Sequence, residues 1–191
     1  MVDNVGLQPA GRLLAVEVRS RRIGFVVFEG PTRLLDWGVR GCQSPTRVLD
    51  KVVAKKVRPL LSHYRPFAVV MRRENQYVSQ TAKRFRISVN AIRKEAHRSG
   101  VETRLLKKKS IKRFSDQLQY GAKHQVAEVI AGLFEELSWK AQPQRKAWHS
   151  ESYHTVIFDA VVTALVIFGD EFNSEGVEEL IAKTKSFRRL P

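Results

Sequence analysis

The order of the short apolar segments constrains the fold of this chain more than any other feature of its sequence. Three segments rich in β-branched residues, 13–18, 23–28 and 33–39, follow one another with only short polar or Gly-Pro breaks between them. This pattern predicts three consecutive antiparallel strands. Two more runs of strand length, 66–71 and 101–106, then alternate with helical patterns, which is typical of parallel pairing through crossovers. The sequence therefore predicts an α/β fold in which a mixed five-stranded sheet carries helices on both faces.

The helices are predicted from apolar residues that recur every three or four positions. Ser44 and Pro45 have the character of an N-cap followed by proline at the first helical position, so a helix is expected to begin there. A second helix is expected near 78–98, with Gly100 as its end. Two further apolar stripes mark helices in the C-terminal half, at 126–137 and 153–168.

Composition favours one soluble domain. The 191 residues, 43% of them hydrophobic, suffice for a single core, which we expect over residues 1–170, with 171–191 as a peripheral C-terminal helix or tail. Cys42 is the lone cysteine, so an internal disulfide and a multi-cysteine zinc site are excluded and a reducing cytoplasm is expected. The apolar stretch 156–168 is too short to cross a bilayer.

The charge of the chain indicates a polyanionic partner. Thirty-four Lys and Arg against 19 Asp and Glu give a net charge of +15, and residues 83–113 alone hold 12 basic and 2 acidic residues. Nucleic acid, DNA in the first place, is the expected partner, with a merely solvated basic surface as the alternative. The side chains expected to contact phosphates are Lys83, Arg84, Arg86, Arg93, Lys94, Lys107, Lys108 and Lys109.

Part of this basic stretch allows another interpretation. Residues 80–92 are similar to a helix-turn-helix, with Ser88 as a cap for its second helix. In that case the chain is a regulator that reads a DNA sequence.

Two carboxylates lie within or beside apolar segments, where a charged side chain is costly unless it is paired or binds a metal. Glu17 interrupts an otherwise apolar strand, and Asp159 flanks the apolar stripe of the last core helix. Carboxylates from distant segments can together hold Mg²⁺ or Mn²⁺, and such ions activate water for phosphodiester hydrolysis. The alternative is structural: an ion pair of Glu17 with Arg19 or another arginine, and of Asp159 with a lysine.

Four segments then resemble one known family in the same order along the chain. Residues Glu17–Phe25 are similar to a first-strand turn of the form Asp-Pro-Gly-Ser-x-x-Thr-Gly-Tyr, and Leu34–Val39 to the third strand. Gly121–Val126 resembles a Gly-x-x-Lys-x-Gln-Val segment, and Asp159-Ala160 a final catalytic Asp-Ala. The family is that of the RuvC Holliday-junction resolvases, within the RNase H-like superfamily. The resemblance implies an Mg²⁺- or Mn²⁺-dependent endonuclease that acts on branched DNA as a homodimer, with Lys123 near a phosphate.

The departures from this family concern its catalytic carboxylates. Glu17 stands where the family has Asp, Arg72 stands at the end of the fourth strand where it has Glu, and Val156 replaces a further acid. Glu74 shares a strand face with Arg72 and is a conditional substitute. The expected catalytic residues are therefore Glu17, Glu74 and Asp159, with Glu17 and Asp159 as metal ligands. Two functions stay open: a divergent endonuclease on branched or structured DNA, and a non-catalytic nucleic-acid-binding protein with a degenerate site.

Overall fold

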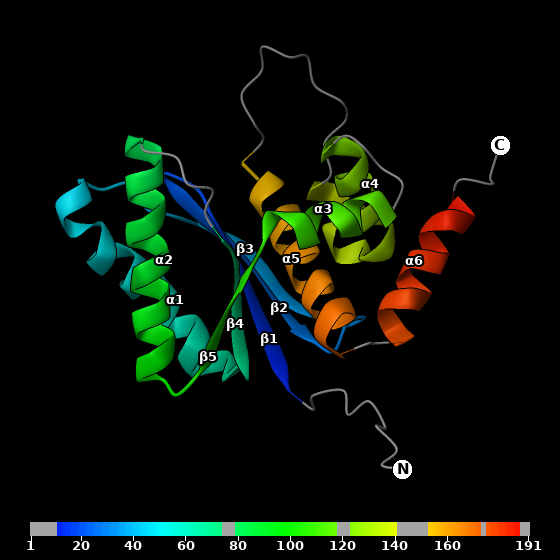
Figure 1. The fold of residues 1–191 in the computed structure, drawn as a ribbon, viewed down its shortest axis with the longest axis horizontal. Coiled ribbons are helices and arrows are strands. Elements are labelled where there is room, and N and C mark those ends of the chain that lie inside the picture. Colours follow the sequence, from blue (N-terminus) through cyan, green and yellow to red (C-terminus); the bar gives the residue numbers. More distant parts are fainter. Residues whose placement is uncertain (1–10, 74–78, 118–122, 141–152, 173–174, 188–191) are drawn as a thin grey trace.

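The computed structural model describes residues 11–73, 79–117, 123–140, 153–172 and 175–187 (Figure 1). The strands are β1 (Arg12–Val18), β2 (Arg22–Glu29), β3 (Leu34–Gly41), β4 (Ala68–Arg72) and β5 (Glu102–Leu106). The helices are α1 (Leu49–Tyr64), α2 (Gln80–Arg98), α3 (Lys108–Gln117), α4 (Lys123–Leu133), α5 (Thr155–Phe172) and α6 (Glu175–Phe187), with the 3-10 helices η1 (Thr46–Val48) and η2 (Glu135–Lys140).

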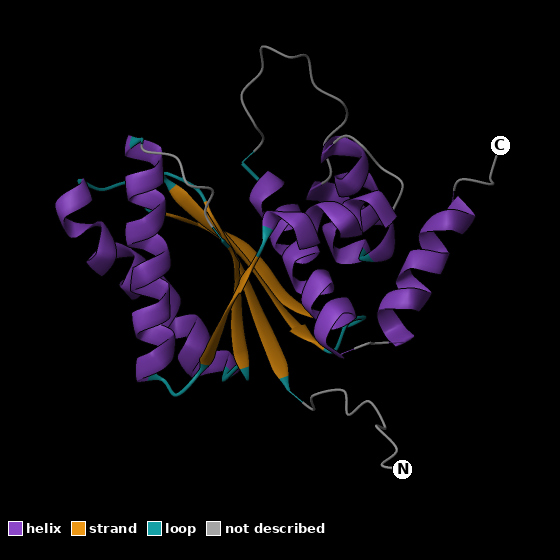
Figure 2. Cartoon of the chain, viewed as in Figure 1, coloured by secondary structure: helices purple, strands orange, loops and turns teal. Residues whose placement is uncertain are grey.

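The strands form a single mixed sheet in the order β3-β2-β1-β4-β5. The first three strands pair antiparallel, whereas β4 is parallel to both β1 and β5. Figure 2 shows helices on both sides of this sheet. The predicted fold class is confirmed, and the central position of β1 explains why its sequence is almost continuously apolar.

The alternation of side chains along β1 assigns its residues to two cores. Leu13 and Ala15 face the core that contains α5, and Leu14 and Val16 face the core that contains α1 and α2. Figure 1 shows the same division, with α1 and α2 on one side of the sheet and α3 to α6 on the other. Helix α5 packs across β1 and β2. A residue's parity along a strand therefore decides which group of helices it meets.

Helix α2 is one uninterrupted helix, so the helix-turn-helix prediction is wrong. Ser88, expected as the cap of a second helix, is buried in the middle of α2. The cap lies instead at Ser79, whose hydroxyl accepts a hydrogen bond from the backbone N–H of Ala82 at 3.1 Å. Ala82, Val89 and Ile92 continue one buried stripe along the helix, and this packing leaves no reason for a turn between them.

Gly100 ends α2 as predicted. Its φ of 68° is left-handed, a conformation that glycine adopts without steric cost. The backbone N–H of Gly100 donates to the carbonyl of His97 at 3.1 Å, and that of Val101 donates to the carbonyl of Ala96 at 2.9 Å. These two bonds form a Schellman motif, which turns the chain directly into β5.

Helix α1 begins later than Ser44 and Pro45 predict. Pro45 is extended, with φ −57° and ψ 146°, and a single 3-10 turn precedes the first α-helical residue, Leu49. Arg84 of α2 donates to the carbonyl of Ser44 at 2.9 Å. Because the Ser44 carbonyl accepts this bond from α2, the contact helps keep the segment before Thr46 extended instead of helical.

The C-terminal half differs from the expectation at two places. Helix α3 was not predicted, because Ile111 and Phe114 are too few to make a recognisable apolar stripe. The helix predicted through Leu137 ends at Leu133, and a 3-10 helix continues the chain. Phe134 and Leu137 still reach the core, Phe134 with its ring 5.3 Å from that of Phe28 in an edge-to-face contact.

The apolar helix α5 lies inside the protein fold. Its residues from Val156 to Phe168 are buried, except Asp159, which is half-buried. Val177 and Leu180 of α6 join the same core. Within the described parts of the chain, no helix has the length and hydropathy needed to span a membrane.

Gly24 of β2 permits the close approach of α5 to the sheet. A Cβ atom at this position would lie 2.6 Å from the carbonyl oxygen of Val156 and 2.7 Å from its Cγ2. Gly24 is also the direct antiparallel partner of Glu17. The absence of a side chain at Gly24 therefore sets how near the start of α5 comes to Glu17.

Gly24→Ala is expected to lower the free energy of unfolding by about 1–3 kcal/mol, because the new methyl group meets the backbone of α5 and forces it outward. Gly41→Ala is the matched control, since a Cβ at that position meets no atom within 4 Å. It should change stability by less than about 0.5 kcal/mol. Urea denaturation monitored by circular dichroism measures both. Equal stabilities of the two variants would contradict the proposed close approach.

Candidate functional site

Glu17 is a buried carboxylate on the α5 face of the central strand. It shares the parity of Leu13 and Ala15, and 1% of its surface is exposed. A charged group in this position is stable only if it is paired, because desolvation of a lone carboxylate costs several kcal/mol. The partners of Glu17 therefore decide the character of the site.

The first partner is Arg72, at the end of the neighbouring parallel strand. The register pairs Val16 with Met71, so the next positions, Glu17 and Arg72, are also neighbours across the two strands. Arg72 has the parity of Val70, which lies in the α5-side core. Its guanidinium donates to Oε1 of Glu17. The pairing of Arg72 with Glu17 therefore follows from the register of β4 against β1 and from the side of β4 on which Arg72 lies.

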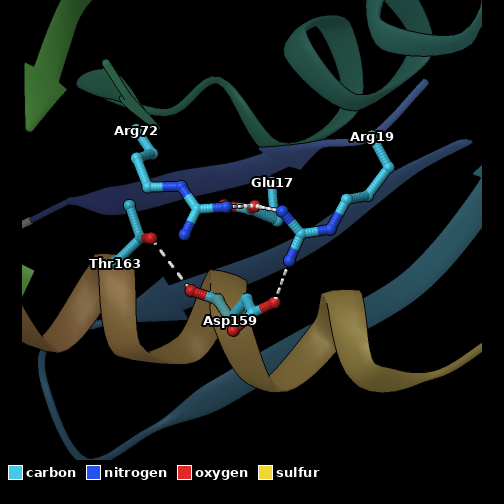
Figure 3. A network of polar contacts seen from close by, with 5 residues as sticks. All are labelled: Glu17, Arg19, Arg72, Asp159 and Thr163. Atoms are coloured by element: carbon cyan, nitrogen blue, oxygen red, sulfur yellow. Dashed lines mark hydrogen bonds and ion pairs between the residues drawn. The ribbon is translucent and has the colours of Figure 1, made fainter. Parts of the chain in front are cut away.

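The second partner is Arg19, which joins the strand to α5. Its Nη1 lies 2.6 Å from Oε1 of Glu17, and its Nη2 donates to Oδ2 of Asp159. Figure 3 shows Arg19 between the two carboxylates, with Arg72 on the other side of Glu17. One turn further along α5, the hydroxyl of Thr163 donates to the backbone carbonyl of Asp159 at 2.9 Å. The structure thus brings Glu17 and Asp159 together, as the sequence predicted, through an arginine.

The residues present do not fit a divalent metal centre. The two carboxylates are balanced by two guanidinium groups, which bind Oε1 of Glu17 and Oδ2 of Asp159, one oxygen of each carboxylate. A cation held there would also lie beside two positive charges. In the part of the chain that the structure describes, no three His, Cys, Asp or Glu side chains come together as a ligand set. The structural alternative for Glu17, a pair with Arg19, is what the geometry shows.

Two predicted site residues cannot be placed. Glu74 lies outside the described residues. Lys123 is the first residue of α4, and the placement of its side chain is likewise outside what is described. Both stay predictions.

Arg84, predicted to contact phosphate, is engaged within the protein. Its Nε donates to the carbonyl of Ser20 at 2.7 Å, and its terminal nitrogens donate to those of Ser44 and Cys42 at 2.9 and 3.2 Å. It ties α2 to the β1–β2 turn and to the segment after β3. This role leaves few of its donors for a phosphate.

The other predicted basic residues divide between the two sides of the sheet. Lys83, Arg86, Arg93 and Lys94 are exposed along α2. Residues 107–109 are exposed at the start of α3, which packs on α5. The sequence does not signal this division, because the two groups lie close together along the chain.

A group of basic residues on α1 was missed by the sequence analysis. Lys51, Lys55 and Arg58 line the same surface hollow as Lys94. Their spacing of four and three residues was the available signal, since it places all three on one helix face.

Comparisons with known proteins agree on the fold. No protein-family model matches the chain, and no curated protein sequence does. Among solved structures, Thermus thermophilus RuvC in complex with a Holliday junction substrate is similar with a TM-score of 0.61 and 19% identity, over 82% of this chain and 91% of that one. Another T. thermophilus RuvC structure gives the same score and identity, over 85% and 96%. The yeast mitochondrial Holliday junction resolvase Ydc2 is similar with a TM-score of 0.59 and 14% identity, over 94% and 85%.

The chain therefore shares the RuvC-type, RNase H-like fold over most of its length. At identities of 14–19% the likeness concerns the fold, and the chemistry must be argued from the site.

Removal of Arg72 tests the charge balance of the site. Arg72→Ala is expected to lower the free energy of unfolding by about 1–3 kcal/mol, because it leaves the buried Glu17 carboxylate with less compensation. In a Glu17→Gln background the same substitution should cost much less, since no charge then needs a partner. Arg73→Ala is the control, as its side chain is exposed. Urea denaturation of the wild type, Arg72→Ala, Glu17→Gln and the double variant gives the coupling energy between the two side chains. A coupling energy near zero would contradict the ion pair.

Proposed function

We propose that this protein is a nucleic-acid-binding protein on a RuvC-type fold in which the former nuclease site holds a structural ion-pair network. The observation that carries the proposal is the placement of Arg19 and Arg72 on the carboxylates of Glu17 and Asp159. Of the two functions left open by the sequence, the geometry favours the non-catalytic one.

The chemistry of hydrolysis explains this preference. Metal-assisted phosphodiester cleavage needs carboxylate oxygens free to bind a cation that polarises the phosphate and activates water. Here one oxygen of each carboxylate, Oε1 of Glu17 and Oδ2 of Asp159, accepts a hydrogen bond from a guanidinium group. Glu17 and Asp159 then serve to hold α5 against the sheet, through Arg19, rather than to activate water.

Binding of nucleic acid is supported by charge and by fold. The net charge is +15, and the exposed face of α2 carries several cations. A similar structure is described as a complex with a Holliday junction substrate. We propose DNA as the partner, with branched or otherwise structured DNA as the preferred form, and the homodimer implied by the resemblance as the binding state.

A combined binding and cleavage assay tests the proposal. Labelled four-way junction, duplex and single-stranded DNA are each incubated with the protein in Mg²⁺ and in Mn²⁺. We expect binding whose affinity falls steeply with salt, because phosphate contacts release counterions, and no cleavage. Asp159→Asn, Glu17→Gln and Glu74→Gln should leave cleavage absent and affinity within about twofold, a change expected of side chains outside the phosphate contacts.

Two outcomes would overturn the proposal. Metal-dependent cleavage that is lost in Asp159→Asn would show a working nuclease site and restore the endonuclease hypothesis. Absence of binding to every DNA form at low salt would remove DNA as the partner. Sedimentation velocity with and without junction DNA measures the state of assembly in the same samples.

A further inference from the structure

A groove between α1 and α2 gathers cations from both helices. It has a volume of about 550 Å³ and lies on the side of the sheet opposite α5. Its charged lining residues are Asp50, Lys51, Lys55 and Arg58 from α1 and Lys94, Glu95 and Arg98 from α2. Five cations thus face two carboxylates, which leaves an excess of three positive charges in one hollow.

Glu95 holds two of these cations side by side. It is 3% exposed, and its carboxylate accepts hydrogen bonds from Nε of Arg58 at 2.9 Å and from Nη1 of Arg98 at 2.5 Å. The hydrogen bond from Arg58, aided by Arg98 and opposed by burial, lowers the pKa of the Glu95 carboxyl below its ordinary value of 4.5. Glu95 is therefore a fixed anion that orients one guanidinium from each helix.

These two arginines keep free donors toward solvent. Arg58 uses only Nε and Arg98 only Nη1 in their contacts with Glu95, and their side chains are 64% and 67% exposed. The remaining N–H groups form the planar fork that suits phosphate oxygens. Because Glu95 already restrains both side chains, less conformational entropy is lost when a phosphate binds.

The lysines around the arginines are available for further contacts. Within the described residues no ion pair joins Lys51, Lys55 or Lys94 to a carboxylate. A second hollow of about 630 Å³ adjoins the first, because Lys94 and Arg98 line both. Arg93 and His97 also line it. The positive surface therefore runs from α1 across α2 toward β5.

We infer that the groove between α1 and α2 binds the sugar–phosphate backbone of a nucleic acid, with Glu95 as the residue that positions Arg58 and Arg98 for phosphate. This inference rests on the proposed function and deepens it, since it names the surface. The groove belongs to helices on the face of the sheet away from Asp159. Nucleic acid bound there needs no contact with the Glu17–Asp159 site.

Salt dependence of binding tests the groove. Lys51→Ala combined with Lys55→Ala should weaken binding of a duplex or junction roughly tenfold at low salt and reduce the slope of log K against log salt by about 1–2, one for each lost phosphate contact. Arg33→Ala combined with Lys183→Ala removes the same charge outside the groove, where both side chains pair with carboxylates. This control should change affinity by less than about twofold with an unchanged slope.

The positioning role of Glu95 and a purely electrostatic role predict opposite changes in affinity for nucleic acid when Glu95 is replaced. Glu95→Gln makes the groove more positive, so charge alone would tighten binding. If Glu95 positions Arg58 and Arg98, loss of their fixed orientation should instead weaken binding of nucleic acid by roughly threefold or more. Arg58→Lys keeps the charge and loses the planar fork, and it should weaken binding similarly. Circular dichroism confirms that each variant is folded before it is compared.

The outcomes separate the two proposals. If the wild type binds DNA and the groove pair behaves like the control pair, the groove inference is overturned and the proposed function stands. If the wild type binds no nucleic acid, the proposed function itself fails. If the lysine pair weakens binding but Glu95→Gln tightens it, the groove binds phosphate and the positioning role of Glu95 is overturned.

Discussion

The pairing of one buried carboxylate is the interaction on which the rest of this structure depends. Glu17 lies in the central strand beneath α5, where an unpaired charge would be very costly. Arg72 from the next strand and Arg19 from the following turn both bind it. Arg19 also binds Asp159 of α5. The arginine that neutralises Glu17 in β1 therefore also helps to hold α5 against the sheet.

Under the proposed function, the same arrangement explains why the site does not hydrolyse a phosphodiester. In this structure, the ends of β1 and β4 and the start of α5 meet, and Gly24 brings them close. What that meeting point does depends on the side chains placed there. Carboxylates without guanidinium partners can bind a divalent cation. With a guanidinium on each carboxylate, charges balance within the protein, and the site becomes part of the fold.

On the proposed function, the surface rather than the Glu17–Asp159 site binds nucleic acid. Several exposed cations lie along α2 and in the groove that α2 shares with α1. Two residues fix the geometry of this surface. Arg84 anchors α2 to the strands, and Glu95 accepts hydrogen bonds from two arginines of the groove. A fold can keep its affinity for a polyanion after its hydrolytic site has changed, since phosphate contacts and metal ligands are different residues.

The sequence by itself determined the sheet and most of the helices, because strand periodicity, Gly100 and segment order are local signals. It also singled out Glu17 and Asp159 as candidate site residues, through their unusual positions and the family resemblance. Helix α3 and the start of α1 were not determined locally, since they depend on a few core contacts and on a hydrogen bond from Arg84. The sequence offered a Glu17–Arg19 pair as one alternative, and the tertiary structure decided in its favour and added the other partners. Arg72 reaches Glu17 through strand register, and Arg58 reaches Glu95, 37 residues away in sequence, through helix packing. Local patterns specify how each segment buries its apolar face, whereas ion pairs depend on where whole segments are placed.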